Sequence, residues 1–425
     1  MLLRLAFVVL VGSAPSALRS EDCASRLTKA NLTGRGITVA ILDSGFRGYR
    51  EHLGKELPTS VKAKSFRTDG NLEAKDSSHG TVCAEIIHAV APDANLVFAN
   101  WEPDQPGSFL QAAKWAREQG ATILCCSIVM PGWSDGLGGG EAHRELERLL
   151  GDSLFFASAG NLAERHWSGA FQERGRVSAP WTGIAISRGA YATPLHGSGA
   201  LHEWQTGRTE NVVNPWGGQP VSVELTSRDA STYRILLIDS LGKSVAMEQP
   251  LAGRGLNGSA VRFMPKIGET YRVQVELVSE RGGEFRLLVL GGELEIATAN
   301  GCMVFPGDGK NVVAVGAVSA EGERIRYSST GSTGARVKPD CVAPVPFVSA
   351  IRRAPFGGTS AAAPQAAGLA ALMWSRDPQT KSAAIREMLW KNCTDLGIPG
   401  PDAETGYGMI RLPLLVPARQ GPAKE

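Results

Sequence analysis

Four short motifs in this 425-residue chain carry side chains that can do chemistry together. The last of them, Gly357-Gly358-Thr359-Ser360, runs directly into an alanine-rich apolar pattern that predicts a helix. A serine at a helix N-terminus lies beside unpaired backbone N–H groups, and these groups favour a negative charge that develops there. An ordinary capped helix would have the same pattern. We expect Pro364 in the first helical turn, where its missing N–H costs nothing.

Three upstream motifs supply the groups that would activate such a serine. Asp43 and Asn161 each follow an apolar run typical of a strand in a parallel sheet, and His79 opens a predicted helix. His79 can take the proton of Ser360, and Asp43 would hold the imidazole in the required tautomer. Asn161 carries a side-chain amide that can donate hydrogen bonds. Alone, His79 or Asn161 could be a capping or turn residue; together the four predict acyl transfer.

The order Asp43, His79, Asn161, Ser360, with the serine on a Gly-Thr-Ser-x-x-x-Pro turn, resembles the subtilisin-like serine peptidases (subtilases, peptidase family S8). The resemblance covers roughly residues 33–200 and 300–415. It implies an Asp-His-Ser triad, an oxyanion asparagine and the hydrolysis of protein or peptide substrates. The substrate-binding residues that it implies are Ser127, Ile128, Val129, Ala157, Ser158, Ala159 and Gly160.

Two other functions compete with an active peptidase. A catalytically weak or inactive binding scaffold on the same fold stays open, because some positions depart from the family pattern. Glu85 stands where the family usually has glycine, and Val129 adds bulk where members commonly end the substrate-binding strand in Ser-Leu-Gly. An esterase on an α/β-hydrolase fold fails, because no Gly-x-Ser-x-Gly motif precedes a later Asp and His. The small and apolar residues 157–160 slightly favour a hydrophobic first pocket.

The segments outside the middle of the chain alternate short apolar strands with helices. Strands are expected at 37–42, 95–99, 121–128, 153–158 and 311–317, and helices at 81–89, 108–119 and 141–150. This alternation predicts an α/β fold in which helices cover both faces of a mostly parallel sheet. It agrees with the three-layer fold that the family resemblance implies.

The pattern changes to short alternating strands between residues 202 and 299. Tyr271, Val273 and Val275 show the period of two, and turn glycines separate such runs. We therefore expect an inserted all-β sandwich, which resembles the jelly-roll or pre-peptidase C-terminal-like modules of secreted bacterial peptidases. An inert structural domain and a module that binds substrate or a surface are both open. The expected division is a signal peptide at 1–20, peptidase parts at 21–201 and 300–417, the insert at 202–299 and a tail at 418–425.

The N-terminus has the short basic start, apolar run and small residues of a secretory signal peptide, with cleavage expected near Ala17. The apolar run is too short to span a bilayer, although an uncleaved anchor is the alternative. We therefore expect a secreted or periplasmic protein with no membrane contact after signal cleavage. Many secreted subtilases carry an N-terminal prodomain, and we expect none here, because only about twenty residues would separate the cleavage site from the strand before Asp43.

Composition limits the partners and cofactors. A formal net charge of +2, from 44 basic and 42 acidic residues, and the absence of a basic cluster with aromatic residues argue against a nucleic-acid partner. The seven cysteines show no metal-binding spacing, so we expect no metal site and no required cofactor. Structural calcium is left open, because no loop has a recognisable ligand spacing. Cys83, Cys125, Cys126 and Cys341 lie in apolar segments and are expected to be buried; some subtilases carry a cysteine just after the catalytic histidine. The oligomeric state is not indicated.

Overall fold

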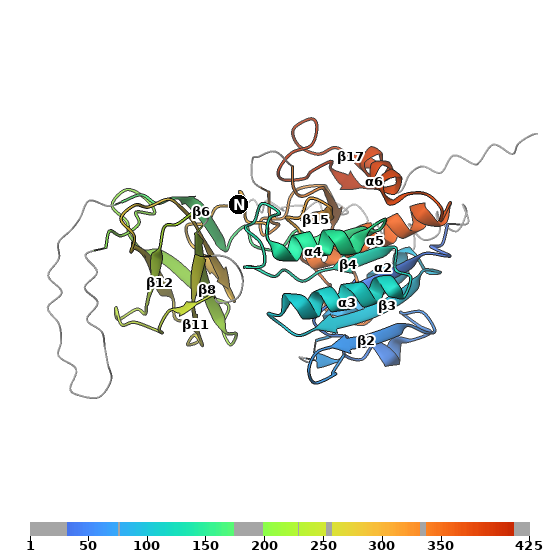
Figure 1. The fold of residues 1–425 in the computed structure, drawn as a ribbon, viewed down its shortest axis with the longest axis horizontal. Coiled ribbons are helices and arrows are strands. Elements are labelled where there is room, and N and C mark those ends of the chain that lie inside the picture. The colour runs from blue at the N-terminus through green and yellow to red at the C-terminus, as the bar shows by residue number, and fades with distance from the viewer. Residues whose placement is uncertain are drawn as a thin grey trace, which may run out of the picture.

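The computed structural model describes residues 32–74, 77–173, 199–227, 229–251, 257–331 and 337–411. The predicted signal peptide at 1–20 and the predicted tail at 418–425 lie outside the described residues. The described chain forms two lobes, which lie side by side in Figure 1. None of the described helices has the length and apolarity that crossing a lipid bilayer requires.

A nine-stranded sheet forms the centre of the larger lobe, in the order β17-β18-β16-β15-β5-β4-β1-β3-β2. All neighbouring strands are parallel except β17 and β18. The strands are β1 (Thr38–Leu42), β2 (Lys62–Phe66), β3 (Asn95–Trp101), β4 (Ile123–Cys126), β5 (Leu154–Ser158), β15 (Val312–Val318), β16 (Cys341–Pro344), β17 (Cys393–Thr394) and β18 (Met409–Ile410). The predicted α/β fold with a mostly parallel sheet is confirmed.

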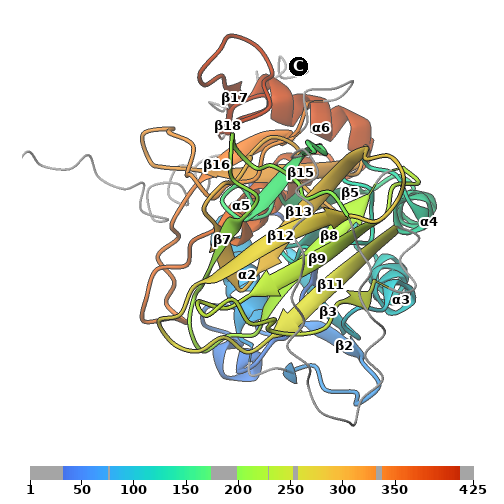
Figure 2. The ribbon, with the colours of Figure 1, turned by 90° about the vertical axis from the view of Figure 1, so that its left-hand side faces the viewer.

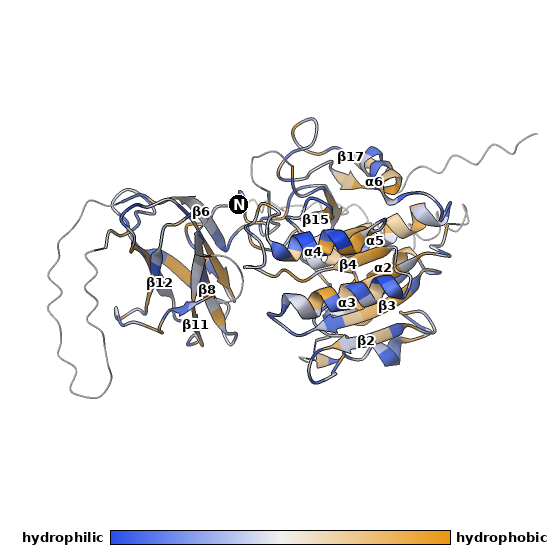
Figure 3. Cartoon of the chain, in the orientation of Figure 1, coloured by the Kyte–Doolittle hydropathy of each residue, from blue (hydrophilic) through white to orange (hydrophobic). Residues whose placement is uncertain are grey.

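Helices cover both faces of this sheet, because its strands are apolar on both faces. In β1, Val39 and Ile41 enter one hydrophobic core while Ala40 and Leu42 enter the other. The helices of the first core are α2 (His79–Val90), α5 (Thr359–Ser375) and α6 (Ser382–Lys391), and those of the second are α3 (Pro106–Glu118) and α4 (Glu141–Leu150). Figure 1 shows α3 and α4 on the viewer's side of the sheet, and Figure 3 shows the apolar strands between the helix layers.

Two antiparallel sheets form the smaller lobe, which we call the β lobe and which faces the viewer in Figure 2. Their strand orders are β10-β11-β8-β13-β6 and β14-β7-β12-β9. The strands are β6 (His166–Ala170), β7 (Asn211–Pro215), β8 (Val221–Ser227), β9 (Tyr233–Ile238), β10 (Gln249–Pro250), β11 (Asn257–Phe263), β12 (Tyr271–Leu277), β13 (Glu284–Leu290) and β14 (Gly292–Leu294). Both sheets contribute to one core, in which Val223 and Phe285 of one sheet join Val273 of the other.

The β lobe begins earlier in the chain than residue 202, where we expected the inserted strands to start. The strand β6 pairs antiparallel with β13, with His166 opposite Leu288. Its sequence, His-Trp-Ser-Gly-Ala, has no apolar alternation, and its side chains range from buried to exposed. The sheet therefore recruits a strand that the period-two pattern could not reveal.

A small hydrophobic cluster joins the two lobes. Its buried members are Leu162, Ala163, Leu288, Cys302 and Val304. Val129 from the larger lobe and Leu290 from β13 pack against these residues. Beside them the buried Arg286 donates hydrogen bonds to the carbonyl oxygens of Asp135 at 3.2 Å and Met303 at 3.4 Å. The strand β13 is thus held to the larger lobe by both apolar and polar contacts.

We expect Leu288→Ala to lower the free energy of unfolding by roughly 2–5 kcal/mol, because it leaves a cavity at this junction. The matched control is Leu241→Ala, since Leu241 lies in the same lobe and is 90% exposed. The control should change the free energy of unfolding by no more than about 0.5 kcal/mol. Urea unfolding followed by tryptophan fluorescence measures both variants. Equal effects of the two substitutions would contradict the junction described above.

Candidate active site

Three neighbouring strands carry the polar residues of the site at one edge of the central sheet. The strand β4 lies between β1 and β5, and all three run parallel, so their carboxyl ends meet at the same edge. Asp43 follows β1, Ser127 follows β4 and Asn161 comes shortly after β5. The structure therefore brings together residues that are far apart in the sequence.

His79 is the first residue of α2, and its ring is held by Asp43. The His79 Nδ1 atom lies 2.8 Å from Asp43 Oδ2 and 3.0 Å from Oδ1. The Ser44 N–H also donates to Asp43 Oδ1, at 2.8 Å. Asp43 is fully buried, whereas the His79 side chain is 25% exposed. Because a carboxylate accepts hydrogen bonds, this contact places a proton on Nδ1 and leaves Nε2 free to act as a base.

The environment of His79 favours the imidazolium form. Burial is the largest single influence on the pKa of His79 and lowers it. The charge and hydrogen bond of Asp43, together with the contacts of Cys83, outweigh burial, so the net pKa lies well above the ordinary value. The Asp43 charge is the largest of the influences that raise the pKa of His79.

Ser360 is the second residue of α5, and Ser127 holds it from two sides. The Ser360 hydroxyl donates to the Ser127 carbonyl oxygen at 3.2 Å. In return, the Ser127 hydroxyl donates to the Ser360 carbonyl oxygen, also at 3.2 Å. In the described part of the chain, the Ser360 hydroxyl has no hydrogen bond to His79. This hydroxyl therefore points to the end of β4.

The reciprocal contact depends on Pro364, and here the prediction from sequence was wrong. Pro364 is the sixth residue of α5 and not part of its first turn. A proline has no N–H, so the carbonyl group four residues earlier, that of Ser360, loses its helical partner. The Ser127 hydroxyl and the Cys83 thiol, the latter at 3.7 Å, take over this carbonyl oxygen. The missing helical bond is thus replaced by contacts from α2 and from the end of β4.

Asn161 caps the N-terminus of α5 with its side-chain oxygen. Asn161 Oδ1 accepts hydrogen bonds from the Thr359 N–H at 3.0 Å and the Thr359 hydroxyl at 2.9 Å. Because a backbone N–H can only donate, the amide oxygen must face Thr359, and Nδ2 faces the other way. Gly358 is needed beside it: φ is +76°, and a Cβ atom there would lie 2.8 Å from Asn161 Nδ2. The Asn161 amide is thus fixed with its N–H donors free for another partner.

The expected substrate-binding residues divide into two groups. Ser127, Val129 and Gly160 lie together near Ser360: the Gly160 N–H donates to the Thr359 hydroxyl at 3.1 Å, and a Cβ atom on Gly160 would lie 3.3 Å from Val129 Cγ1. Ile128 is half-buried beside them. Ala157, Ser158 and Ala159 are buried within or next to β5. The Val129 side chain therefore lies against Gly160, between the segments that follow β4 and β5.

Two aromatic residues of the site were missed in the sequence. The Phe356 ring lies edge-on to the His79 ring, with centroids 5.3 Å apart. The Tyr327 hydroxyl accepts a hydrogen bond from the Gly358 N–H at 3.0 Å and so supports the turn before Ser360. Phe356 directly precedes the Gly-Gly-Thr-Ser motif, but a single aromatic residue before a turn carries no periodic signal. Only the tertiary contacts identify it.

One cysteine, Cys83, also belongs to a group of side chains that could bind a metal ion. Six described cysteines are free thiols, and Cys83, Cys125, Cys126 and Cys341 are buried, as expected. In the described ranges, one group could hold a metal ion: the ligand atoms of Asp43, His79 and Cys83 lie within 4.8 Å of one another. Its nitrogen is the His79 Nδ1 that Asp43 already binds, so a metal there would disrupt the hydrogen-bonded pair.

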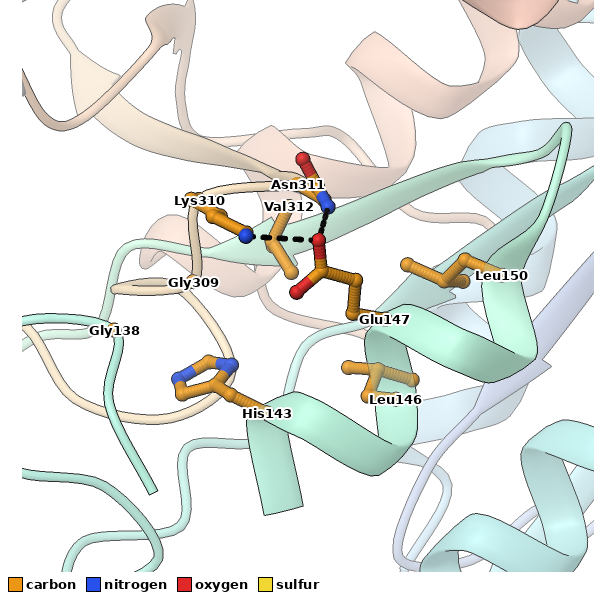
Figure 4. Close-up of a pocket in the computed structure, with 9 residues that line it drawn as sticks. All are labelled: Gly138, His143, Leu146, Glu147, Leu150, Gly309, Lys310, Asn311 and Val312. Atoms are coloured by element: carbon orange, nitrogen blue, oxygen red, sulfur yellow. Dashed lines mark hydrogen bonds and ion pairs between the residues drawn. The ribbon is translucent and has the colours of Figure 1, made fainter. Parts of the chain in front are cut away.

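A second histidine–aspartate pair lies away from this site, beside α4. His143 Nε2 lies 2.8 Å from Asp308 Oδ1, and both side chains are buried. Burial alone would raise the pKa of Asp308, but the contacts with His143, together with hydrogen bonds from Ser134 and Gly138, outweigh burial and lower it. The adjacent cavity of about 20 Å³ holds space for about one water molecule. Figure 4 shows it beside Glu147, which Lys310 and Asn311 bind at 2.9 and 2.7 Å.

Known proteins and solved structures are similar to this chain in sequence or in fold. The Minor extracellular protease Epr of Bacillus subtilis strain 168 is 34% identical over 107 residues, which are 25% of this chain and 16% of that protein. Subtilisin E of the same organism is 36% identical over 97 residues, 22% of this chain and 24% of that protein. The chain thus matches less than a quarter of the length of each. The structure of the Clostridium perfringens CspB protease has a similar fold, with a TM-score of 0.62, 14% identity, and coverage of 92% of this chain and 96% of that one.

A family model extends over most of the larger lobe. The model of Peptidase S8, the subtilase family, matches residues 34–193 and 294–408. The unmatched segment between them contains most strands of the β lobe. The two matched segments contain Asp43, His79, Asn161 and Ser360 and together exceed half of the chain. The chain therefore belongs to the subtilase family, peptidase S8.

Proposed function

We propose that this chain is a serine endopeptidase that hydrolyses peptide bonds through Asp43, His79 and Ser360. The observation that carries the proposal is the convergence of four groups at one sheet edge: the Asp43–His79 pair, the Ser360 hydroxyl and the fixed Asn161 amide. This is the set that acyl transfer requires, namely a nucleophile, an oriented base and donors for an oxyanion. Family membership supports the same reaction.

The chemistry follows from the atoms that these residues present. With the Ser360 hydroxyl turned toward His79 Nε2, its oxygen attacks the substrate carbonyl carbon and its proton passes to Nε2. The Asn161 amide and the Ser360 N–H then bind the oxyanion. Collapse breaks the C–N bond, and the proton on His79 Nε2 goes to the leaving amine. Water repeats the sequence on the acyl-enzyme and regenerates the Ser360 hydroxyl.

An inactive binding scaffold is the second candidate, and one observation favours it. Among the described residues, the Ser360 hydroxyl is hydrogen-bonded to the Ser127 carbonyl oxygen and not to His79. Catalytic hydrogen bonds are often formed only with substrate bound, so this arrangement does not exclude catalysis. The buried carboxylate that holds His79 has no evident use in a scaffold. The peptidase is therefore the function that the geometry supports better.

Peptide substrates would add as an extended strand beside residues 127–129, since β4 ends there with its backbone directed toward Ser360. Val129 stands over Gly160 in this region and packs against the cluster that joins the two lobes. The side chain next to the scissile carbonyl must pass between these two segments. The hydrophobic preference expected from sequence is therefore narrowed in this proposal to small apolar side chains.

Export, cofactors and partners complete the proposal. The predicted signal peptide at residues 1–20 supports a secreted or periplasmic location, and one relative is named an extracellular protease. The triad chemistry needs no cofactor and no catalytic metal. Protein or peptide substrates are the proposed partners, without nucleic acid and without a membrane after signal cleavage.

Labelling with a fluorophosphonate tests the nucleophile. We expect the parent to be labelled and to hydrolyse unfolded casein, and Ser360→Ala to lose labelling and to lose roughly 10⁶-fold in kcat. The control is Ser65→Ala, a serine of the peripheral strand β2. It should keep parental labelling and hydrolysis. Casein hydrolysis by Ser360→Ala at the parental rate would disprove the role of Ser360, and a parent that is folded but neither labelled nor active would favour the scaffold.

The pH dependence tests the base. Only neutral His79 can accept the proton of Ser360, and the pKa of His79 is raised. The acid limb of the pH profile, in which kcat/KM rises with pH, should therefore have its midpoint above the ordinary imidazole pKa of about 6.5. Asp43→Asn removes the charge that raises this pKa, so the limb should move to lower pH while kcat falls about 10⁴-fold. Asp308→Asn, in the other histidine–aspartate pair, should leave the limb in place. A parental limb at or below pH 6.5 would contradict the assignment.

Substituting Val129 tests the proposed preference for small side chains. With peptide anilides that differ only in the residue before the cleaved bond, the parent should prefer Ala to Phe. Val129→Gly opens the space above Gly160 and should raise the Phe-to-Ala ratio of kcat/KM by about 10- to 100-fold. Val278→Gly, at a half-exposed valine of the β lobe, is the matched control and should leave the ratio unchanged. An unchanged ratio in Val129→Gly would show that Val129 does not limit the size of the side chain before the cleaved bond.

A further inference from the structure

Glu85 is a buried carboxylate on α2, the helix that begins with His79. It is 5% exposed, and both of its oxygens accept hydrogen bonds from one loop. The Ser349 hydroxyl donates to Oε2, and the Ala350 N–H donates to Oε1 at 2.6 Å. Within the described ranges no cation pairs with Glu85. A buried charge without a counter-charge must be satisfied by hydrogen bonds, so the carboxylate and the loop hold each other in place.

The loop that Glu85 binds is a hairpin, residues 347–356, which we call the clamp hairpin. Its ends pair through two backbone hydrogen bonds of 2.8 Å between Phe347 and Phe356. At its turn, the Ser349 hydroxyl oxygen accepts hydrogen bonds from the N–H groups of Ile351 at 3.2 Å and Arg352 at 3.1 Å. Ser349 thus organises the turn and donates to Glu85 at the same time. Fixing Ser349 therefore fixes the whole hairpin.

The clamp hairpin ends beside both the base and the nucleophile. The Phe356 side chain is 4% exposed and lies edge-on to the His79 ring, at a centroid distance of 5.3 Å and an interplanar angle of 77°. Gly357 and Gly358 follow, and α5 with Ser360 begins directly after them. The position of the hairpin therefore determines two things: how closely Phe356 covers His79, and where the chain enters α5.

We propose that Glu85 is a positioning residue. It holds the clamp hairpin so that Phe356 covers His79 and so that the chain enters α5 with Ser360 in the position that the reaction needs. In the part of the chain that the structure describes, Glu85 has no hydrogen bond to Asp43, His79 or Ser360; it acts through Ser349 and Ala350. The proposal rests on the proposed peptidase function, and it assigns a use to the carboxylate that stands where the family usually has glycine. The helix α2 thereby carries both the base and the anchor for the segment that delivers the nucleophile.

Removing the carboxylate should loosen the hairpin, because the donors of Ser349 and Ala350 lose their buried acceptor. A misplacement of reacting groups by about 1 Å can lower the rate about 10²-fold, so kcat of Glu85→Ala should fall by that order with KM little changed. Phe356 would also cover His79 less. Since burial lowers the pKa of His79, better hydration should raise that pKa further and move the acid limb of kcat/KM to higher pH.

The direction of this shift separates positioning from a direct effect of charge. If the negative charge of Glu85 acted on His79 through space, its removal would lower the pKa of His79 and move the limb to lower pH. Glu85→Gln separates positioning from a charge effect in a second way, because the amide oxygen of the new side chain can still accept a hydrogen bond from the Ala350 N–H. We expect kcat of Glu85→Gln to stay within about fivefold of the parent. A charge effect would make Glu85→Gln and Glu85→Ala alike.

The experiment compares Glu85→Ala, Glu85→Gln and Ser349→Ala with the parent in kcat, KM, the pH profile of kcat/KM and an NMR titration of the His79 ring. Glu102→Ala is the matched control, because Glu102 likewise accepts from a backbone N–H and a hydroxyl, those of Thr68, but at an exposed position. The control should change none of these readouts. The NMR titration needs no substrate, so it reports on the hairpin even if the parent proves inactive, which would refute the peptidase function separately.

Each outcome decides for or against the proposal. A lower kcat and a limb at higher pH in Glu85→Ala, with recovery in Glu85→Gln, support it. Parental kcat and an unchanged His79 titration in Glu85→Ala overturn it, as does a shift to lower pH or a Glu85→Gln variant as impaired as Glu85→Ala. If Glu85→Ala does not fold, Ser349→Ala decides: a lower kcat with a higher pKa of His79 supports the proposal, and parental values overturn it.

Discussion

The close packing of α2 against α5 fixes how far His79, the proposed base, lies from Ser360, the proposed nucleophile. Gly368 of α5 lies so near to α2 that a Cβ atom on it would be 2.8 Å from the Cβ atom of Val90. Near the other end of the contact, the Cys83 thiol reaches the Ser360 carbonyl oxygen at 3.7 Å. Since His79 begins α2 and Ser360 lies at the start of α5, this crossing sets the spacing of the pair. Small side chains in α5 are therefore a condition for the site.

Pro364 links this packing to the position of the Ser360 side chain. It leaves the Ser360 carbonyl group without a helical partner, and this carbonyl oxygen accepts a hydrogen bond from the Ser127 hydroxyl. In turn, the Ser127 carbonyl oxygen accepts a hydrogen bond from the Ser360 hydroxyl. The same residue would contact a bound peptide, because it ends the strand beside which substrate would lie. In the proposed function, a bound peptide and the Ser360 hydroxyl would therefore lie at the same backbone group, the Ser127 carbonyl.

The sequence predicted what depends on local periodicity and missed what depends on tertiary contacts. The strands that lead to Asp43 and Asn161 are long apolar runs, so they and the parallel sheet could be predicted. The strand β2 escaped because its lysines are exposed at the sheet edge, and β6 escaped because it has no alternation. The position of Pro364 was misjudged because the start of α5 is set by Asn161, from another part of the chain, capping Thr359. No local pattern could assign partners to Glu85.

The β lobe is connected to the site more directly than its place in the sequence suggests. Val129 packs against the cluster that contains Leu288, so the end of the proposed substrate-binding segment, residues 127–129, rests partly on a β-lobe strand. Arg286 of the same strand donates to the Asp135 carbonyl oxygen, in the loop that continues from that segment. A displacement of β13 would therefore move the wall that Val129 forms beside Gly160. If Val129 limits the substrate site as proposed, the additional sheets influence which side chains fit next to the scissile bond, because they support that residue.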